Sequence, residues 1–454
     1  MQTISAEQAL TETGWQRDVR VEIGDDGRIA RVSAGGAAEG HRVDILLPAP
    51  VNLHSHAFQR AMAGLTERRG PDPRDTFWTW RRLMFRFLDR LTPEDVEAIA
   101  AFVQMEMLEA GYAAVGEFHY LHHQPGGAPY AALGELSARI VAAAETSGIG
   151  LTLLPVLYEQ GGCDGRPLAS GQIRFGNDFD RFARLLEEAG AALERLPDDA
   201  RLGVAPHSLR AVSQTGLAAA VSLAGERPVH IHLAEQVAEV EEMAAAWGAR
   251  PVEWLLDNAA VGPRWCLIHA TQMQPHETTA LAATGGVVGL CPITESSLGD
   301  GIFDGVRYLG AGGRIGVGSD SNIRIRLWEE LRTLDYSQRL RDLSRAALAT
   351  ADASTGRRLF EAVCLGGAQA VARDAGRIAP GALADLVSLD GTAPDLAGRS
   401  GDTILDSAIF AGGDTAVRDV WAAGRHLVAE GRHNGREAIV ARYLATQRGL
   451  RDAI

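Results

Sequence analysis

The sequence predicts an α/β protein in which a (β/α)8 TIM-like barrel carries a small β-sandwich domain built from both chain termini. Eight short apolar segments alternate with helical segments over about 300 residues, which is typical of such a barrel. The 454 residues are enough for a barrel of about 250 residues and a second unit. Further short strands are expected before and after the barrel, which predicts the small domain.

The terminal strands are predicted from apolar and polar residues that alternate between turn sequences. They lie within residues 1–47, at 384–389 and at 417–428. The simplest interpretation joins residues 1–47 and 366–454 in one composite β-sandwich domain with a C-terminal helix. The barrel then occupies residues 48–365.

The barrel strands are predicted from short, β-rich apolar runs. They lie at 45–53, 113–120, 152–157, 202–205, 229–233, 265–268, 286–290 and 314–318. The best-signalled helix begins after Thr92, because Thr92 and Asp95 can form a capping box around Pro93, and Gly111 can end it. Barrel enzymes carry their chemistry at the C-terminal ends of the strands.

The charged residues exclude several function classes. The 58 acidic residues outnumber the 44 basic ones and give a net charge of −14, which argues against a nucleic-acid partner. The sequence contains no lysine, so all 44 basic residues are arginine. This excludes a Schiff-base lysine, a Walker P-loop and a metal site bridged by a carbamylated lysine.

The expected location is the cytoplasm. No apolar run approaches the ~20 residues that span a bilayer, and the N-terminus lacks the basic start and apolar core of a signal peptide. The four cysteines have no CxxC or disulfide-type spacing, so we expect buried thiols in a reducing compartment. No membrane partner is predicted.

Four predicted strand ends carry a histidine or an aspartate. His54 and His56 end the first strand and face the same way, because side chains alternate along a strand. His232, His269 and Asp320 end the fifth, sixth and eighth strands. None of these residues is strong evidence by itself. A His-x-His pair also occurs by chance, and a buried histidine or aspartate can simply be hydrogen-bonded within the core. Together they predict a catalytic metal centre of three histidines and one aspartate with an open position.

Two residues beside His232 have different predicted roles. Glu235 follows three residues later, where it can lie over the site and act as a general acid or base. The alternative is an exposed carboxylate at a helix start, and the acidic run 235–242 reads most simply as a solvated helix face. His230 lies one layer deeper and is expected to be a hydrogen-bonded core histidine.

A second polar group suits an anionic ligand. Its members follow strand ends or an aromatic cluster: Gln59, Arg60, Arg81, Arg82, Tyr120, His207 and Arg210. Arginine binds carboxylates in a bidentate manner, so this lining predicts an acidic substrate despite the negative chain. The alternative for each arginine is an ordinary surface charge.

These residues stand in passages that resemble the amidohydrolase superfamily and, within it, the formimidoylglutamate deiminases, the iminohydrolases of bacterial histidine degradation. The passages include NLHSHAFQRAMAGL, TFWTWRRLMFRF, VAPHSLRAV, VHIHLAEQ and GVGSDSN, and the resemblance spans about residues 50–345.

The resemblance implies one divalent metal ion per subunit, most simply Zn²⁺, although this type of donor set also suits iron. The implied ligands are His54, His56, His232 and Asp320. Glu235, His269 and Asp320 are implied to handle protons. The implied substrate is N-formimino-L-glutamate, a small anion hydrolysed to N-formyl-L-glutamate and ammonia. Its implied binding residues are Gln59, Arg81, Tyr120, His207 and Arg210, with Arg81 preferred to Arg82 because it directly follows FWTW. A homodimer is expected from the family.

Two alternatives stay open at this point. One is another one-metal aminohydrolase that acts on a purine, pyrimidine or triazine ring, whose pocket would favour aromatic and amide contacts over paired arginines. The other is a non-catalytic barrel that serves as an assembly or binding module, which would have lost some of the four ligands.

Overall fold

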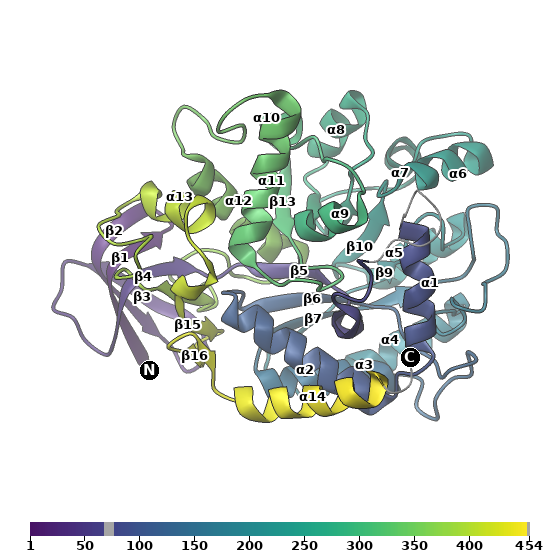
Figure 1. Ribbon diagram of the computed structural model, residues 1–454, viewed down its shortest axis with the longest axis horizontal. Coiled ribbons are helices and arrows are strands. Elements are labelled where there is room, and N and C mark those ends of the chain that lie inside the picture. Colours follow the sequence, from purple (N-terminus) through teal and green to yellow (C-terminus); the bar gives the residue numbers. More distant parts are fainter. Residues whose placement is uncertain (68–76, 452–454) are drawn as a thin grey trace.

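The computed structural model describes residues 1–67 and 77–451. Figure 1 shows a barrel whose strands are surrounded by helices, with the terminal strands gathered at one side of it. Among the described residues, no helix combines the length and apolarity that crossing a membrane requires. All four cysteines are buried and none forms a disulfide, as expected.

The barrel is closed and parallel. Its strands are β5 (Val51–Ser55), β6 (Ala114–His119), β7 (Gly150–Leu157), β8 (Arg201–Leu202) with β9 (Ala205–Pro206), β10 (Val229–Leu233), β11 (Trp265–His269), β12 (Val287–Leu290) and β13 (Arg314–Val317). They form one sheet from β5 to β9 and another from β10 to β13. Parallel bridges between Val204 and Val229, Ser208 and His232, and Ser55 and Asp320 join the two sheets, which confirms the predicted barrel.

Helices cover the outside of the barrel. They are η1 (Ala57–Met62), α1 (Phe77–Leu88), α2 (Pro93–Glu109), α3 (Glu135–Ser147), α4 (Phe179–Leu193), α5 (Gln214–Ala224), α6 (Val237–Trp247), α7 (Pro251–Asn258), α8 (Pro275–Ala282), α9 (Pro292–Leu298), α10 (Gly305–Gly310), α11 (Leu327–Asp342) and α12 (Thr355–Ala370). Helix α2 starts as predicted: the Asp95 amide donates to Thr92 Oγ1 at 3.2 Å, and the Thr92 amide donates to Asp95 Oδ2 at 3.1 Å.

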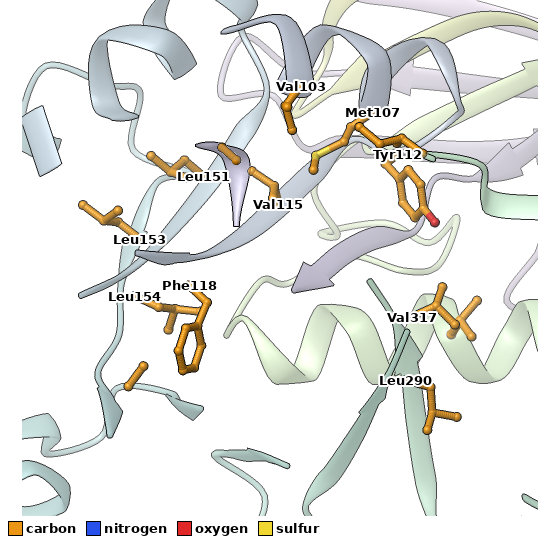
Figure 2. Packing of buried hydrophobic residues seen from close by; sticks show 14 of the residues in the cluster. Val103, Met107, Tyr112, Val115, Phe118, Leu151, Leu153, Leu154, Leu290 and Val317 are labelled. Atoms are coloured by element: carbon orange, nitrogen blue, oxygen red, sulfur yellow. The ribbon is translucent and has the colours of Figure 1, made fainter. Parts of the chain in front are cut away.

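The core lies between the strands and these helices. Figure 2 shows Val103 and Met107 of α2 near Val115 of β6, with Leu151 and Leu153 of β7 in the same cluster. Every residue of β5, β6 and β7 is buried. A strand covered on both faces reads as a continuous apolar run rather than an alternating one, which is why the barrel strands could be located from the sequence.

Two predicted strands differ from the observed ones. The run 45–53 is divided between β4 (His41–Pro48), which pairs with terminal strands, and β5 of the barrel. The break falls at residues 49–50, where Pro50 has no amide hydrogen to offer a neighbouring strand. The fourth strand is interrupted between β8 and β9, and a Cβ at Gly203 would lie 2.5 Å from the Leu154 side chain.

Both chain ends contribute to one eight-stranded sheet. Its strands are β1 (Gln2–Thr11), β2 (Gly14–Ile23), β3 (Ile29–Ala34), β4, β14 (Leu386–Leu389), β15 (Val417–Ala422), β16 (Arg425–Ala429) and β17 (Arg432–His433), in the order β17-β16-β15-β14-β4-β1-β2-β3. Residues from both ends also share one buried apolar cluster. Helix α13 (Asp402–Phe410) and the short η2 (Asp414–Ala416) connect β14 to β15.

The predicted domain boundaries at 47/48 and 365/366 stay a prediction. The second boundary lies inside α12, which packs on β13 and β5 of the barrel. The C-terminal helix α14 (Arg436–Arg451) packs on α2 of the barrel, and Figure 1 shows the two helices side by side.

A buried ionic network ties the terminal sheet to the barrel. Arg373 follows α12 and donates to both Asp385 oxygens, at 2.5 and 2.8 Å. It also lies 2.8 Å from Asp199, which precedes β8, and Arg425 of β16 lies 2.9 Å from the same carboxylate. These residues meet at the N-terminal ends of the barrel strands, opposite the end where barrel enzymes act.

We expect Arg373→Met to lower the free energy of unfolding by about 3 to 5 kcal/mol, because it leaves the buried Asp385 carboxylate without its cation and Asp199 with Arg425 alone. Urea unfolding measures the change. Arg377→Met is the matched control: its partner Asp374 is exposed, so the change should stay within about 0.5 kcal/mol. Equal stability of the two variants would contradict the structural role of Arg373.

Candidate active site

A polar pocket opens at the C-terminal ends of the barrel strands. The lining residues are His56, Gln59, Trp80, Arg81, Met84, Tyr120, Tyr158, Phe175, His207, Arg210, His232, Glu235, His269, Leu298, Asp320 and Ser321. All five residues predicted to bind substrate, and all three predicted to handle protons, are among them. The structure therefore brings the two predicted groups together in one cavity.

The histidines and the aspartate converge beneath this pocket. The ligand atoms of His54, His232, His269 and Asp320 all lie within 4.8 Å of one another. His56 belongs to the same cluster, because its Nε2 lies 3.2 Å from Asp320 Oδ1, beside His54 Nε2 at 3.3 Å. The predicted ligand set and this set share His54, His232 and Asp320.

The backbone adopts an unusual conformation at His269 and Asp320. His269 and Asp320 have φ values of 71° and 46°, a left-handed conformation that non-glycine residues seldom adopt. The Asp320 amide donates to the His54 carbonyl, and the His56 amide donates to the Asp320 carbonyl, both at 2.9 Å. The turn after β13 thus closes the barrel against β5 and aims the Asp320 carboxylate at both histidines. Such strain at non-glycine residues clusters at functional sites.

Three of the histidines are held through Nδ1. Their partners are the Phe118 carbonyl for His56 at 3.0 Å, the His207 carbonyl for His232 at 3.0 Å, and Glu295 Oε1 for His269 at 3.2 Å. A ring that donates from Nδ1 to a carbonyl keeps Nε2 as the atom available to a metal.

The donor set fits a metal ion. His54 is buried, and within the described chain neither of its ring nitrogens makes a hydrogen bond. Burial lowers the pKa of His54 to about 3 and also lowers the pKa of His56 and His232, so these rings are neutral at pH 7. Although burial opposes it, the neighbouring histidines lower the pKa of Asp320. Neutral imidazoles around an ionised carboxylate are the forms in which these groups bind a divalent metal.

Glu235 is buried at the rim of this cluster. Its Oε1 lies 4.0 Å from His269 Nε2, too far for a direct hydrogen bond but close enough to share a bound reactant. Its amide donates to Glu239 Oε2 at 3.0 Å, and Thr271 Oγ1 donates to its carbonyl at 2.6 Å. Burial raises the pKa of Glu235, and His269 and Arg210 oppose that rise. The exposed helix-start alternative for Glu235 is therefore wrong.

His269 has the opposite electrostatic environment from the other histidines. Burial alone would lower its pKa, but the carboxylates of Glu235, Glu295 and Asp320 raise the pKa of His269 to about 10. Glu295, on α9, thus both orients the ring and contributes to its charge.

The substrate-binding candidates line the same pocket as the histidine cluster. Gln59 donates from Nε2 to the Tyr120 hydroxyl at 2.7 Å, while its Oε1 is buried without a hydrogen-bond partner in the described chain. Arg81 donates to the Tyr158 hydroxyl at 2.8 Å. Arg210 is buried; burial opposes its charge, but Glu239 and Glu235 raise its pKa, so it remains a cation.

The sequence also predicts three further residues near the site: Arg60, Arg82 and His230. Arg60 does not line the pocket: its guanidinium contacts Glu106 at 2.6 and 3.0 Å. The side chain of Arg82 lies outside those that the structure describes, so the choice between Arg81 and Arg82 stays a prediction. His230 is the core histidine expected, with Nε2 2.8 Å from the Ala370 carbonyl.

Sequence reasoning missed several residues in or beside this pocket, among them Tyr158, Glu239 and Glu295. Tyr158 directly follows β7, so the rule applied to the other strand ends could have found it. Glu239 is fully buried and close enough to Arg210 to raise its pKa, so the expected solvated face over 235–242 is wrong at Glu235 and Glu239. Glu295 carries no signal in the sequence, because its approach to His269 depends on how α9 packs.

The comparisons with known proteins agree with this geometry. The profile of the amidohydrolase family matches residues 45–427, and that of the N-terminal domain of the formimidoylglutamate deiminase HutF matches residues 1–42. The formimidoylglutamate deiminase of Pseudomonas aeruginosa is 50% identical over 441 residues, which cover 96% of this chain and 97% of that protein. The chain belongs to the formimidoylglutamate deiminases of the amidohydrolase family.

Solved structures support the same assignment. The crystal structure of an amidohydrolase from Brucella melitensis has a TM-score of 0.95 and 48% identity, and the match covers 99% of this chain and 100% of that chain. An adenosine deaminase from Xanthomonas campestris, solved with bound zinc, has a TM-score of 0.82 and 22% identity over 99% of this chain and 98% of that chain. The second likeness shows the fold alone. Amidohydrolases depend on metals, and the histidine and aspartate cluster provides this chain with a fitting site.

We expect His232→Ala to lower the metal content by one equivalent per chain, because it removes one donor from a site of four. Elemental analysis of purified protein measures this. His276→Gln, which removes an exposed histidine of α8, is the control and should keep the wild-type content. Unchanged metal content in His232→Ala would remove His232 from the ligand set.

Proposed function

We propose that this protein hydrolyses N-formimino-L-glutamate to N-formyl-L-glutamate and ammonia, in histidine degradation. The observation that carries the proposal is a single pocket in which a histidine and aspartate cluster faces Arg81 and Arg210. The substrate has a C=N group for hydrolysis and two carboxylates for the arginines. The deiminase of Pseudomonas aeruginosa, at 50% identity, supports the same substrate.

The residues that would hold the metal are His54, His56, His232 and Asp320, with one ion per subunit. Three imidazoles and one carboxylate suit Zn²⁺, which we propose as the native ion. When bound, such an ion polarises the reacting group and lowers the pKa of water.

Asp320, His269 and Glu235 handle the protons of the proposed reaction. Asp320 and His269 orient the attacking water, whose oxygen forms the new bond to the formimino carbon. Glu235 carries the first proton lost by the water to the imino nitrogen, so that C=N becomes a single C–N bond. It then carries the proton of the new hydroxyl group to the same nitrogen, the C–N bond breaks, ammonia leaves and the formyl C=O remains. Burial raises the pKa of Glu235 toward neutrality, which suits a group that accepts and returns a proton.

The remaining side chains position the substrate. Arg81 and Arg210 bind its carboxylates, and Tyr120 and His207 contact it between them. The unpartnered Oε1 of buried Gln59 can accept a hydrogen bond from a substrate N–H, because its Nε2 is already used by Tyr120. Fixed contacts of this kind hold the formimino carbon close to the attacking water.

We place the reaction in the cytoplasm, because four buried cysteines without disulfides suit a reducing compartment. The homodimer expected from the family stays a prediction.

Ammonia release from N-formimino-L-glutamate tests the function, with metal-replete enzyme beside a chelator-stripped sample. The proposal expects release that stops on stripping and returns with zinc. Guanine, cytosine and adenosine are the comparison substrates for a ring aminohydrolase. Release from one of these, and none from the linear amidine, would overturn the proposal.

Glu235→Gln should lower kcat by about 100-fold or more, because the amide keeps the size of the side chain but cannot accept the proton. Steady-state ammonia release measures this. Glu241→Gln, at an exposed position of α6, is the matched control and should turn over normally. Near-normal turnover in Glu235→Gln would exclude Glu235 from the proton path.

Arg81→Met should raise KM by about 10-fold or more with a smaller effect on kcat, because a hydrogen bond to a charged group contributes about 1.5 to 3 kcal/mol. Arg86→Met, on the exposed side of α1, should leave both constants unchanged. An unchanged KM in Arg81→Met would shift the carboxylate contact to another residue.

A further inference from the structure

We propose that His41, Asp419 and His426 form a second metal site, for a divalent transition metal such as zinc, on the terminal sheet. The three side chains come from β4, β15 and β16, and Figure 1 shows these strands on the same side of the molecule. The site is distinct from the barrel cluster in both its residues and its sheet. Binding there would join the N-terminal strands to the C-terminal strands.

The donor atoms converge on one point. His426 Nε2 lies 3.0 Å from Asp419 Oδ1, and His41 Nε2 lies 3.5 Å from the same oxygen. One ligand atom from each of the three residues lies within 4.8 Å of the others. A tetrahedral ion with ligands at about 2.0 to 2.1 Å holds neighbouring donors about 3.3 Å apart. The separations of 3.0 and 3.5 Å lie on either side of that distance, so an ion fits after a small movement.

Hydrogen bonds with Ser388 orient the Asp419 carboxylate. Ser388 Oγ of β14 donates to Asp419 Oδ2 at 2.8 Å and accepts from the Asp419 amide at 3.0 Å. This arrangement occupies Oδ2 and leaves Oδ1 directed at the two imidazoles. Metal-binding carboxylates are commonly held by a hydrogen bond of this kind.

The histidines are fixed by Trp421. This buried indole stacks on the His426 ring at 4.6 Å and meets the His41 ring edge-on at 5.5 Å. Packing against one rigid ring reduces the rotamer freedom that each imidazole would lose on binding an ion.

The open side of the cluster faces solvent. The side chains of His41 and His426 are 38% and 28% exposed, whereas that of Asp419 is 9% exposed. An ion can therefore enter directly and complete its coordination with water. Two imidazoles and one carboxylate favour zinc and its neighbours over calcium or magnesium, which prefer oxygen donors. An ion here stabilises the folded chain, because the unfolded chain lacks the assembled site.

Metal stoichiometry of the whole enzyme tests the site. Purified protein is dialysed against micromolar free zinc, and the bound metal per chain is measured in wild type, His41→Gln and His426→Gln. His276→Gln is the control, because it removes an exposed histidine that pairs with Glu253 at 2.9 Å. The expected contents are two zinc ions in wild type and control and one in each of the other variants.

A second measurement follows heat unfolding of enzyme that already holds one ion. Adding the second equivalent should raise the unfolding midpoint of wild type and leave that of His426→Gln unchanged, while ammonia release is the same in both. One ion in wild type at micromolar zinc would overturn the proposal. Two ions in His41→Gln and His426→Gln would overturn it equally.

Discussion

The contact between the turn after β13 and the end of β5 supports both the fold and the site. There the backbone of Asp320 exchanges hydrogen bonds with His54 and His56, which joins the last barrel strand to the first. The Asp320 side chain lies against the same two histidines. Because the same residue joins the first and last barrel strands and faces the histidine cluster, the cluster assembles only when these strands are in place. A local unfolding of either strand would disperse the donors.

This arrangement concentrates unfavourable groups in a small volume. Buried histidines without full hydrogen bonding, a raised carboxyl pKa at Glu235 and left-handed residues at His269 and Asp320 all reduce stability. The apolar layer beneath offsets them: Phe118 packs against the rings of His54 and His232 and belongs to the large core cluster. A ligand that satisfies these donors therefore stabilises the fold while it supplies chemistry.

The sequence predicted the parts of this site that depend on strand ends. His54, His232 and Asp320 end short apolar runs, and in a parallel barrel all such ends meet on one face, so their convergence followed from topology alone. The division of 45–53 did not follow, because an apolar run does not reveal that its first part joins the terminal sheet and its last part joins the barrel. Glu239 was misjudged for a related reason: its place in an acidic run does not reveal that this side of α6 is buried in the fold.

The chain contains no lysine and has a net charge of −14, yet its pocket holds arginines that suit an anion. A buried lysine loses its proton readily, since burial lowers its pKa toward neutrality, whereas a guanidinium stays charged. Arg210 is buried beside Glu235 and Glu239, and those carboxylates further favour its charged form. In the proposed function, this charge serves a carboxylate of the substrate. The acidic surface acts mainly through solvent, where counter-ions screen it within about 8 to 10 Å. Under the proposed function, local arginines rather than the net charge decide which ligand the pocket accepts.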